Sequence, residues 1–234
     1  MARSFNGTSD RIDSGNNAFT GMNLTTATLM VHANQLADIA SGTQFYVATI
    51  TQANGSNVRS IVAVPPAAGT GYRLQSRMHA TAANGNRSGT DLTTGAWQTA
   101  LASINRSALA NLPDLYRNGS LDNAASSSAS GTLITGDDTV RLGANAAASN
   151  FCNAELGFVA IASGGLGASE ANRHRWWGMA PGGPSTMLLC LPLWTDNLAN
   201  KGTAGAVTFT ATGTSMVASP VVERCWASTM GCGR

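Results

Sequence analysis

Charged residues are scarce in this chain. Only 11% of its 234 residues are Asp, Glu, Lys or Arg, against roughly 25% in an ordinary soluble domain. The predicted surface is therefore made of Ala, Gly, Ser, Thr and Asn, which suits a protein that packs against neighbours or stands outside a cell. The formal net charge of +2 and the scattered arginines leave no basic footprint for nucleic acid and no polybasic patch for a membrane.

Long apolar segments are missing as well. The longest candidate, residues 187–194, contains Pro192 and is far too short to cross a bilayer. No apolar h-region follows Met1, so we expect no secretory signal and a chain that is made and folded in a cytoplasm.

Local catalytic motifs are absent too. Lys201, the only lysine, precedes Gly202, which excludes the phosphate-cradling Gly-x-x-x-x-Gly-Lys loop. No Gly-x-Ser-x-Gly nucleophile elbow occurs, although composition alone leaves a Ser-His-Asp arrangement open. The lone His32 lies in a β-branched stretch and is interpreted as a hydrogen-bonded strand residue. The sequence therefore predicts a non-enzymatic protein.

Cysteines are few and form neither a metal motif nor a disulfide framework. Cys152 and Cys190 lie on or beside predicted core strands. Cys225 and Cys232 have six residues between them, which allows a local disulfide loop around Trp226. In a cytoplasm both of these thiols would start reduced, so their pairing stays open.

Short alternating segments separated by turns are what the sequence does contain. Residues 114–123 are the clearest case, because Asn118-Gly119 supplies the two positive-φ residues of a type I′ hairpin, with Leu115 and Leu121 flanking it. A turn followed by alternating residues spans 93–104, where Trp97 is expected to anchor a sheet face. Further strands are predicted at 25–36, 44–51, 59–64, 72–78, 138–144, 155–161, 187–194 and 206–211.

Residues 72–78 alternate cleanly between two faces. Tyr72 and Leu74 belong to the predicted core face, whereas Arg73 and Arg77 are expected to face water or a partner. Residues 84–89 are interpreted as a flexible loop with a solvated tip. The low-complexity run 124–131 is expected to be an exposed loop or an edge segment.

One short helix is predicted near residues 169–177. Ser169 can cap it and Pro181 lies just beyond its end. Trp176 and Trp177 at its end either pin the helix to the rest of the domain or form an exposed platform for a sugar ring. Packing is the favoured interpretation, because large aromatic side chains are usually buried.

Several segments follow one another in a distinctive order. They are residues 4–12, Trp97 before a strand, 116–119 on a hairpin, 140–143, 155–161, 166–172, 191–194, 212–214 and Pro220. In this order they resemble the laminin-G/pentraxin-like jelly rolls, the concanavalin A-like lectin/glucanase fold, in the version common in phage virion proteins and bacterial surface proteins. The resemblance implies an all-β fold, a two-sheet antiparallel jelly-roll sandwich over residues 1–222. Residues 223–234 form a tail outside the pattern.

The resemblance also bears on calcium and on catalysis. Some laminin-G relatives bind calcium at a rim, and Asp137 and Asp138 are candidate ligands here. Asp10 and Asp13 invite the same interpretation, but solvated turn residues are the favoured explanation for that pair. Asp137 and Asp138 are equally served in a turn by water and by backbone N–H groups. Glucanases of this fold carry alternating carboxylates in an E-x-D-x-x-E pattern. The three glutamates of this chain do not form it: Glu155, Glu170 and Glu223.

By resemblance, we expect a structural protein displayed on a bacteriophage or phage-like particle, as a capsid decoration, head-fibre or minor tail protein. Its location would be the virion, its partners the major capsid or other virion proteins, and its state a homo-oligomer. The tail with Trp226 is a predicted subunit-contact arm. The alternative is a carbohydrate-binding lectin module acting in adhesion, which would bind host-surface glycan through exposed residues such as Trp176, Trp177 and Trp226. No cofactor is expected, and calcium is the minority alternative.

Overall fold

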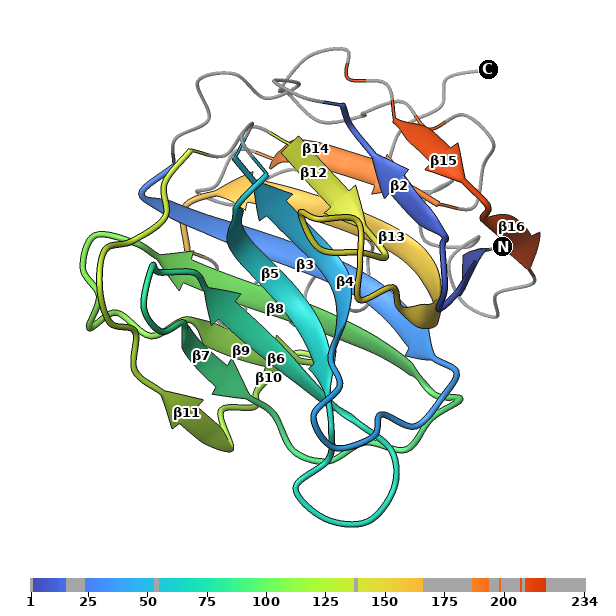
Figure 1. The fold of residues 1–234 in the computed structure, drawn as a ribbon, viewed down its shortest axis with the longest axis horizontal. Coiled ribbons are helices and arrows are strands. Elements are labelled where there is room, and N and C mark those ends of the chain that lie inside the picture. The colour runs from blue at the N-terminus through green and yellow to red at the C-terminus, as the bar shows by residue number, and fades with distance from the viewer. Residues whose placement is uncertain are drawn as a thin grey trace.

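The strands of this chain pair into two antiparallel sheets that lie face to face in a computed structural model (Figure 1). The structure describes residues 2–15, 24–52, 55–136, 139–165, 187–193, 198, 207 and 209–217. No helix occurs in these ranges, so none there is long and apolar enough to span a membrane.

Sheet A has eight strands in the order β10-β9-β8-β3-β13-β1-β16, and β14 pairs with β13 as well. The first part of β13 pairs with β1 and its second part with β14, so these two strands share one side of β13. The strands are β10 (Ser120–Leu121), β9 (Asp114–Arg117), β8 (Trp97–Asn105), β3 (Thr26–Gln35), β13 (Asn153–Ser163), β1 (Ala2–Asn6), β16 (Ser215–Val217) and β14 (Met187–Pro192).

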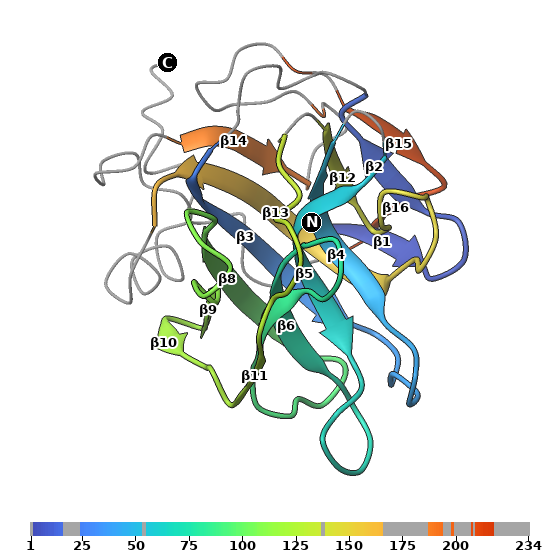
Figure 2. The same cartoon turned by 60° about the vertical axis from the view of Figure 1, so that its left-hand side comes forward.

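Sheet B also has eight strands, in the order β11-β7-β6-β5-β4-β12-β2-β15. In Figure 1, β4, β5 and β6 of this sheet cross in front of β3 and β8 of sheet A, and the turned view of Figure 2 separates the two layers. The strands are β11 (Ala125–Ser127), β7 (Gly85–Ser88), β6 (Arg73–Met78), β5 (Asn57–Val64), β4 (Phe45–Thr51), β12 (Thr139–Leu142), β2 (Arg11–Asp13) and β15 (Thr210–Thr212).

Apolar side chains from the inner faces of both sheets fill the space between them. Leu29, Val31 and Ala33 of β3 point into this core, while the alternate residues Met30 and His32 point outward, as the period of two along a strand requires. The core draws on nearly every long strand, with members that include Phe5, Ile12, Ile50, Ile61, Leu74, Met78, Ala102, Ile104, Leu142, Leu156, Val159, Ile161, Leu189 and Leu191. The predicted all-β sandwich is confirmed.

The predicted hairpin at residues 114–123 is confirmed. Asn118 and Gly119 have φ of 49° and 86°, the two positive values that a type I′ turn needs. Asn118 Oδ1 also accepts a hydrogen bond of 2.9 Å from the backbone N–H of Thr99, which ties the turn to β8. Leu115 is fully buried, whereas Leu121 lies on the opposite face and is 57% exposed.

Two expectations about sheet B are corrected. Residues 84–89 are not a flexible loop, because β7 lies within them and pairs with β6 on one side and β11 on the other. Arg77 does not face water: it is 8% exposed, and neighbouring side chains of its own sheet cover it and bind its guanidinium. The low-complexity run is indeed an edge segment, since β11 ends the sheet and all three of its residues are exposed.

Two predicted features lie outside the described residues. They are the short helix near residues 169–177 and the tail at 223–234, so the boundary drawn at residue 222 stays a prediction.

Candidate functional site

The predicted site residues also lie outside the described part of the chain. This holds for the tryptophans Trp176, Trp177 and Trp226, for the paired aspartates Asp137 and Asp138, and for Cys225 and Cys232. Their proposed roles in glycan binding, calcium binding and disulfide formation therefore stay predictions.

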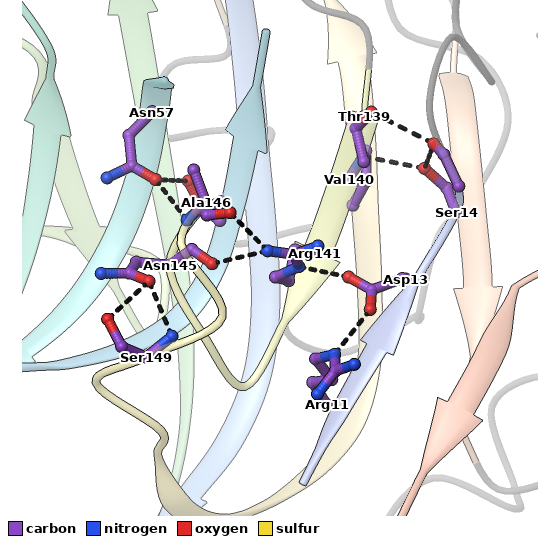
Figure 3. Close-up of polar contacts among 12 residues, drawn as sticks. Arg11, Asp13, Ser14, Asn57, Thr139, Val140, Arg141, Asn145, Ala146 and Ser149 are labelled. Carbon is purple, nitrogen blue, oxygen red and sulfur yellow. Dashed lines mark hydrogen bonds and ion pairs between the residues drawn. The ribbon is translucent and has the colours of Figure 1, made fainter. Parts of the chain in front are cut away.

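Asp13 lies in the described part of the chain, and each oxygen of its carboxylate accepts a hydrogen bond from an arginine (Figure 3). Arg11 Nε donates to Asp13 Oδ2 at 2.9 Å, and Arg141 Nε donates to Asp13 Oδ1. A cation site needs oxygens that are free to coordinate, and both oxygens of Asp13 are engaged. Within the ranges described, no three His, Cys, Asp or Glu side chains gather where a metal ion could be held.

Arg141 fastens the connection between β12 and β13 to sheet B (Figure 3). Its Nη1 donates to the backbone carbonyls of Asn145 at 3.0 Å and Ala146 at 2.6 Å. The N–H of Ala146 in turn donates to Asn57 Oδ1 at 2.8 Å. The side chains of Arg141 and Asn57 form hydrogen bonds with the backbone of this loop, so the network has a structural role.

Asp10 is buried instead of solvated. It is 4% exposed, and its Oδ2 accepts a 3.0 Å hydrogen bond from the backbone N–H of Asn6. Gly213 packs so closely on it that an added Cβ would lie 2.1 Å from Asp10 Oδ1. The aspartate thus holds the turn after β1 against the link between β15 and β16.

A serine–histidine pair on the outer face of sheet B has the distance of a nucleophile and its base. Ser60 Oγ lies 2.9 Å from His79 Nε2. Ser60 is fully buried and His79 is 4% exposed, so a substrate carbonyl cannot reach the hydroxyl in this structure. Burial, and after it the neighbouring Arg77 charge, lowers the pKa of His79 to about 3. The pair is a packed hydrogen bond within the sheet.

A stack of three rings crosses the outer face of sheet A. His32 lies between Trp97 and Phe158, with ring centroids 4.7 Å and 5.7 Å away and interplanar angles of 14° and 8°. Phe158 is 4% exposed, while Trp97 at the end of the stack is half-buried. The indole is therefore packed on His32 and stays partly exposed at the end of the stack.

A row of polar residues begins beside this indole. Strand pairing places Trp97, Asn34, Glu155 and Ser4 directly opposite one another across β8, β3, β13 and β1, and directly paired residues share one face of a sheet. Asn34 Nδ2 donates to Glu155 Oε2 at 3.0 Å. Asn34 is 7% exposed, and its buried Oδ1 has no hydrogen-bond partner among the described residues. We call this the acceptor row, because its unused atoms are carboxylate and amide oxygens.

His32 adds a further unpaired polar atom. Its Nδ1 lies 3.0 Å from Thr99 Oγ1, whereas its buried Nε2 has no partner in the part of the chain that the structure describes. Burial lowers the pKa of His32 from 6.5 to about 4, so the imidazole is neutral at pH 7. The prediction that His32 is a hydrogen-bonded strand residue is confirmed, but it also supports the indole.

Chemically, the arrangement combines a flat apolar surface with hydrogen-bond acceptors at its edge. It suits a ligand with an apolar ring face and a rim of hydroxyl donors. Glu155 is the partly exposed acceptor that such a hydroxyl could reach.

Comparison with known proteins identifies the fold. No protein-family model matches the sequence, and no curated protein matches it either. Two solved structures superpose over most of the chain. One is a native heptameric SAP-like pentraxin from Limulus polyphemus, with a TM-score of 0.61 at 14% identity over 92% of this chain and 93% of the pentraxin. This chain has the concanavalin A-like jelly-roll fold. The other is a putative carbohydrate-binding protein from Bacteroides ovatus, with a TM-score of 0.63 at 13% identity over 95% of this chain and 62% of the Bacteroides chain.

The acceptor row was not found from the sequence. Trp97 was expected to anchor a sheet face, and it does, on the outer face of this jelly roll. Asn34 and Glu155 lie 121 residues apart, so only the pairing of β3 with β13 brings them together. The one local signal was the period of two in β3, which puts His32 and Asn34 on the same face.

Proposed function

We propose that this jelly-roll domain is a non-catalytic carbohydrate-binding module that holds a saccharide against Trp97 on the outer face of sheet A. The observation that carries the proposal is the half-buried indole, packed on His32 and flanked by the acceptor row. The fold supports it at a coarser level, since a structure with the same fold is named a putative carbohydrate-binding protein.

Two contacts would supply the affinity. A sugar ring stacked on the indole would add about 0.5–1.5 kcal/mol beyond the area it buries, as for aromatic pairs. A hydroxyl would donate to Glu155 Oε1, which accepts no hydrogen bond within the described structure and belongs to a partly exposed side chain. A hydrogen bond to a charged group contributes about 1.5–3 kcal/mol.

A glycan array, probed with and without EDTA, tests this function. We expect retention of hydroxyl-rich saccharides that the chelator does not change, because the acceptor row needs no metal. If EDTA abolished retention, a calcium site such as the one predicted at Asp137 and Asp138 would be the binding site instead of Trp97. If no saccharide were retained, the proposal would fail.

The predicted role as a virion structural protein, with capsid partners and a homo-oligomeric state, stays a prediction from sequence resemblance. Neither structural neighbour described above is named as a virion protein. Mass spectrometry of purified particles would test it, through the number of copies of this chain per copy of major capsid protein.

A further inference from the structure

The outer face of sheet B offers hydrogen-bond donors, whereas the acceptor row on sheet A offers acceptors. Arg77 on β6 is 8% exposed, and within the described residues its guanidinium donates only to neutral groups. Nε and Nη2 donate to Gln75 Oε1, the former at 2.8 Å. Nη1 donates to Gln44 Oε1 at 2.8 Å and to the Tyr46 hydroxyl at 3.4 Å. Its Cζ lies 6.0 Å from the centre of the Tyr46 ring.

No carboxylate pairs with Arg77 in the described part of the chain. The ion pair found on the same strand, at 3.6 Å, joins Asp91 to Arg73 instead. A guanidinium keeps its charge at any ordinary pH, and burying a charge without a counter-charge is unfavourable. Neutral amide and phenol oxygens offset only part of that cost, so the site is suited to an anion.

Unused donors surround this charge. A guanidinium has five N–H donors, and four contacts are made here. The Tyr46 hydroxyl accepts from Arg77, and among the described residues neither its own proton nor the amide nitrogen of Gln44 has a hydrogen-bond acceptor. Tyr46 also packs with Val62 and Val64 into a small apolar cluster on this face. Donors, a positive charge and an apolar floor thus lie together.

We propose that Gln44, Tyr46 and Arg77, the Arg77 cluster, form a second binding site that accepts the carboxylate or sulfate group of an acidic saccharide. That the anion belongs to a saccharide rests on the proposed function, whereas the anion site itself rests on the cluster. Sheet B faces the viewer in Figure 1, and the acceptor row lies on the far side of sheet A. The two sites therefore do not compete for one sugar residue.

Titration calorimetry of three probes tests the inference: a neutral oligosaccharide retained on the array, an oligogalacturonate, and a sulfated oligosaccharide. Arg77→Gln should weaken the binding of at least one acidic probe about tenfold or more and leave the neutral probe unchanged. Tyr46→Phe keeps the ring and removes one donor, so it should weaken the acidic probe about threefold even if Arg77→Gln folds poorly. The comparison of carboxylate with sulfate identifies the group bound.

Arg73→Gln is the matched control, because Arg73 lies on the same strand and face but already pairs with Asp91. It should leave acidic binding unchanged. An equal loss in Arg73→Gln and Arg77→Gln would mean general charge attraction and would overturn the site. Acidic binding that survives both Arg77→Gln and Tyr46→Phe would overturn it as well.

Inorganic sulfate separates this inference from the proposed function. Sulfate should raise the melting temperature of the wild type and of Trp97→Ala, but not that of Arg77→Gln. If it stabilises wild type and Arg77→Gln equally, the anion site fails while neutral binding at Trp97 can stand. If neutral saccharides do not bind but sulfate acts through Arg77, the proposed function fails and the anion site remains.

Discussion

Two histidines on opposite outer faces, His32 on sheet A and His79 on sheet B, are held neutral by burial. Their pKa values of about 4 and about 3 lie below the ordinary 6.5. Between these values and pH 6.5 the unfolded chain binds protons that the folded chain does not. Stability is therefore fully present above pH 6.5 and is lost as the pH falls toward the folded pKa values.

Removing the more buried histidine should flatten this pH dependence. We expect the free energy of unfolding of the wild type to fall between pH 6.5 and pH 4, with His79 contributing on the order of 3 kcal/mol. His79→Asn should be less stable at pH 7, because Ser60 loses its partner, but should lose less on acidification. Urea unfolding at a series of pH values measures both quantities, and parallel curves for the two proteins would contradict the assignment.

Elements with a local signal were predictable from the sequence, and those that depend on distant pairing were not. The Asn118-Gly119 hairpin was predicted because two adjacent residues determine the turn. Strand β7 was missed because its glycine- and polar-rich sequence resembles a loop, and it becomes a strand only between β6 and β11. Arg77 was placed on the correct face, but its burial depends on side chains from β4 and β6 that the alternation pattern does not reveal.

Gly69 and Gly71 lie in the connection between β5 and β6, and substituting each of them tests how closely this connection packs on its neighbours. Both have positive φ, 77° and 104°, yet an added Cβ at Gly71 would lie 2.0 Å from the backbone oxygen of Leu92, while at Gly69 nothing lies within 4 Å. Leu92 forms the bridge that holds Tyr72.

Gly69→Ala should cost about 1–2 kcal/mol, the cost of the left-handed backbone alone. Gly71→Ala should cost at least about 3 kcal/mol, because the bridge must shift or break. Chemical denaturation of the two variants measures the difference. Equal losses would show that the approach to Leu92 is not as close as described.

At the scale of the whole molecule, the two outer faces of the sandwich differ in the hydrogen-bonding groups that they carry. The outer face of sheet A carries an indole and unused acceptors, and that of sheet B carries a buried cation and unused donors. The resemblance predicted the all-β class and the jelly roll, and composition predicted a surface with few charges. Neither located the acceptor row or the Arg77 cluster, since each is assembled from strands that are distant in the sequence and adjacent in a sheet.

The measurement that tests the central proposal most directly is the affinity of wild type and Trp97→Ala for the strongest saccharide on the array. Loss of the stacking surface should weaken binding at least about tenfold, equivalent to about 1.4 kcal/mol. Leu121→Ser is the control, because Leu121 is an exposed apolar residue on the same outer face of sheet A, away from the ring stack; its affinity should equal that of the wild type. Binding by Trp97→Ala within about twofold of wild type would contradict the proposed site.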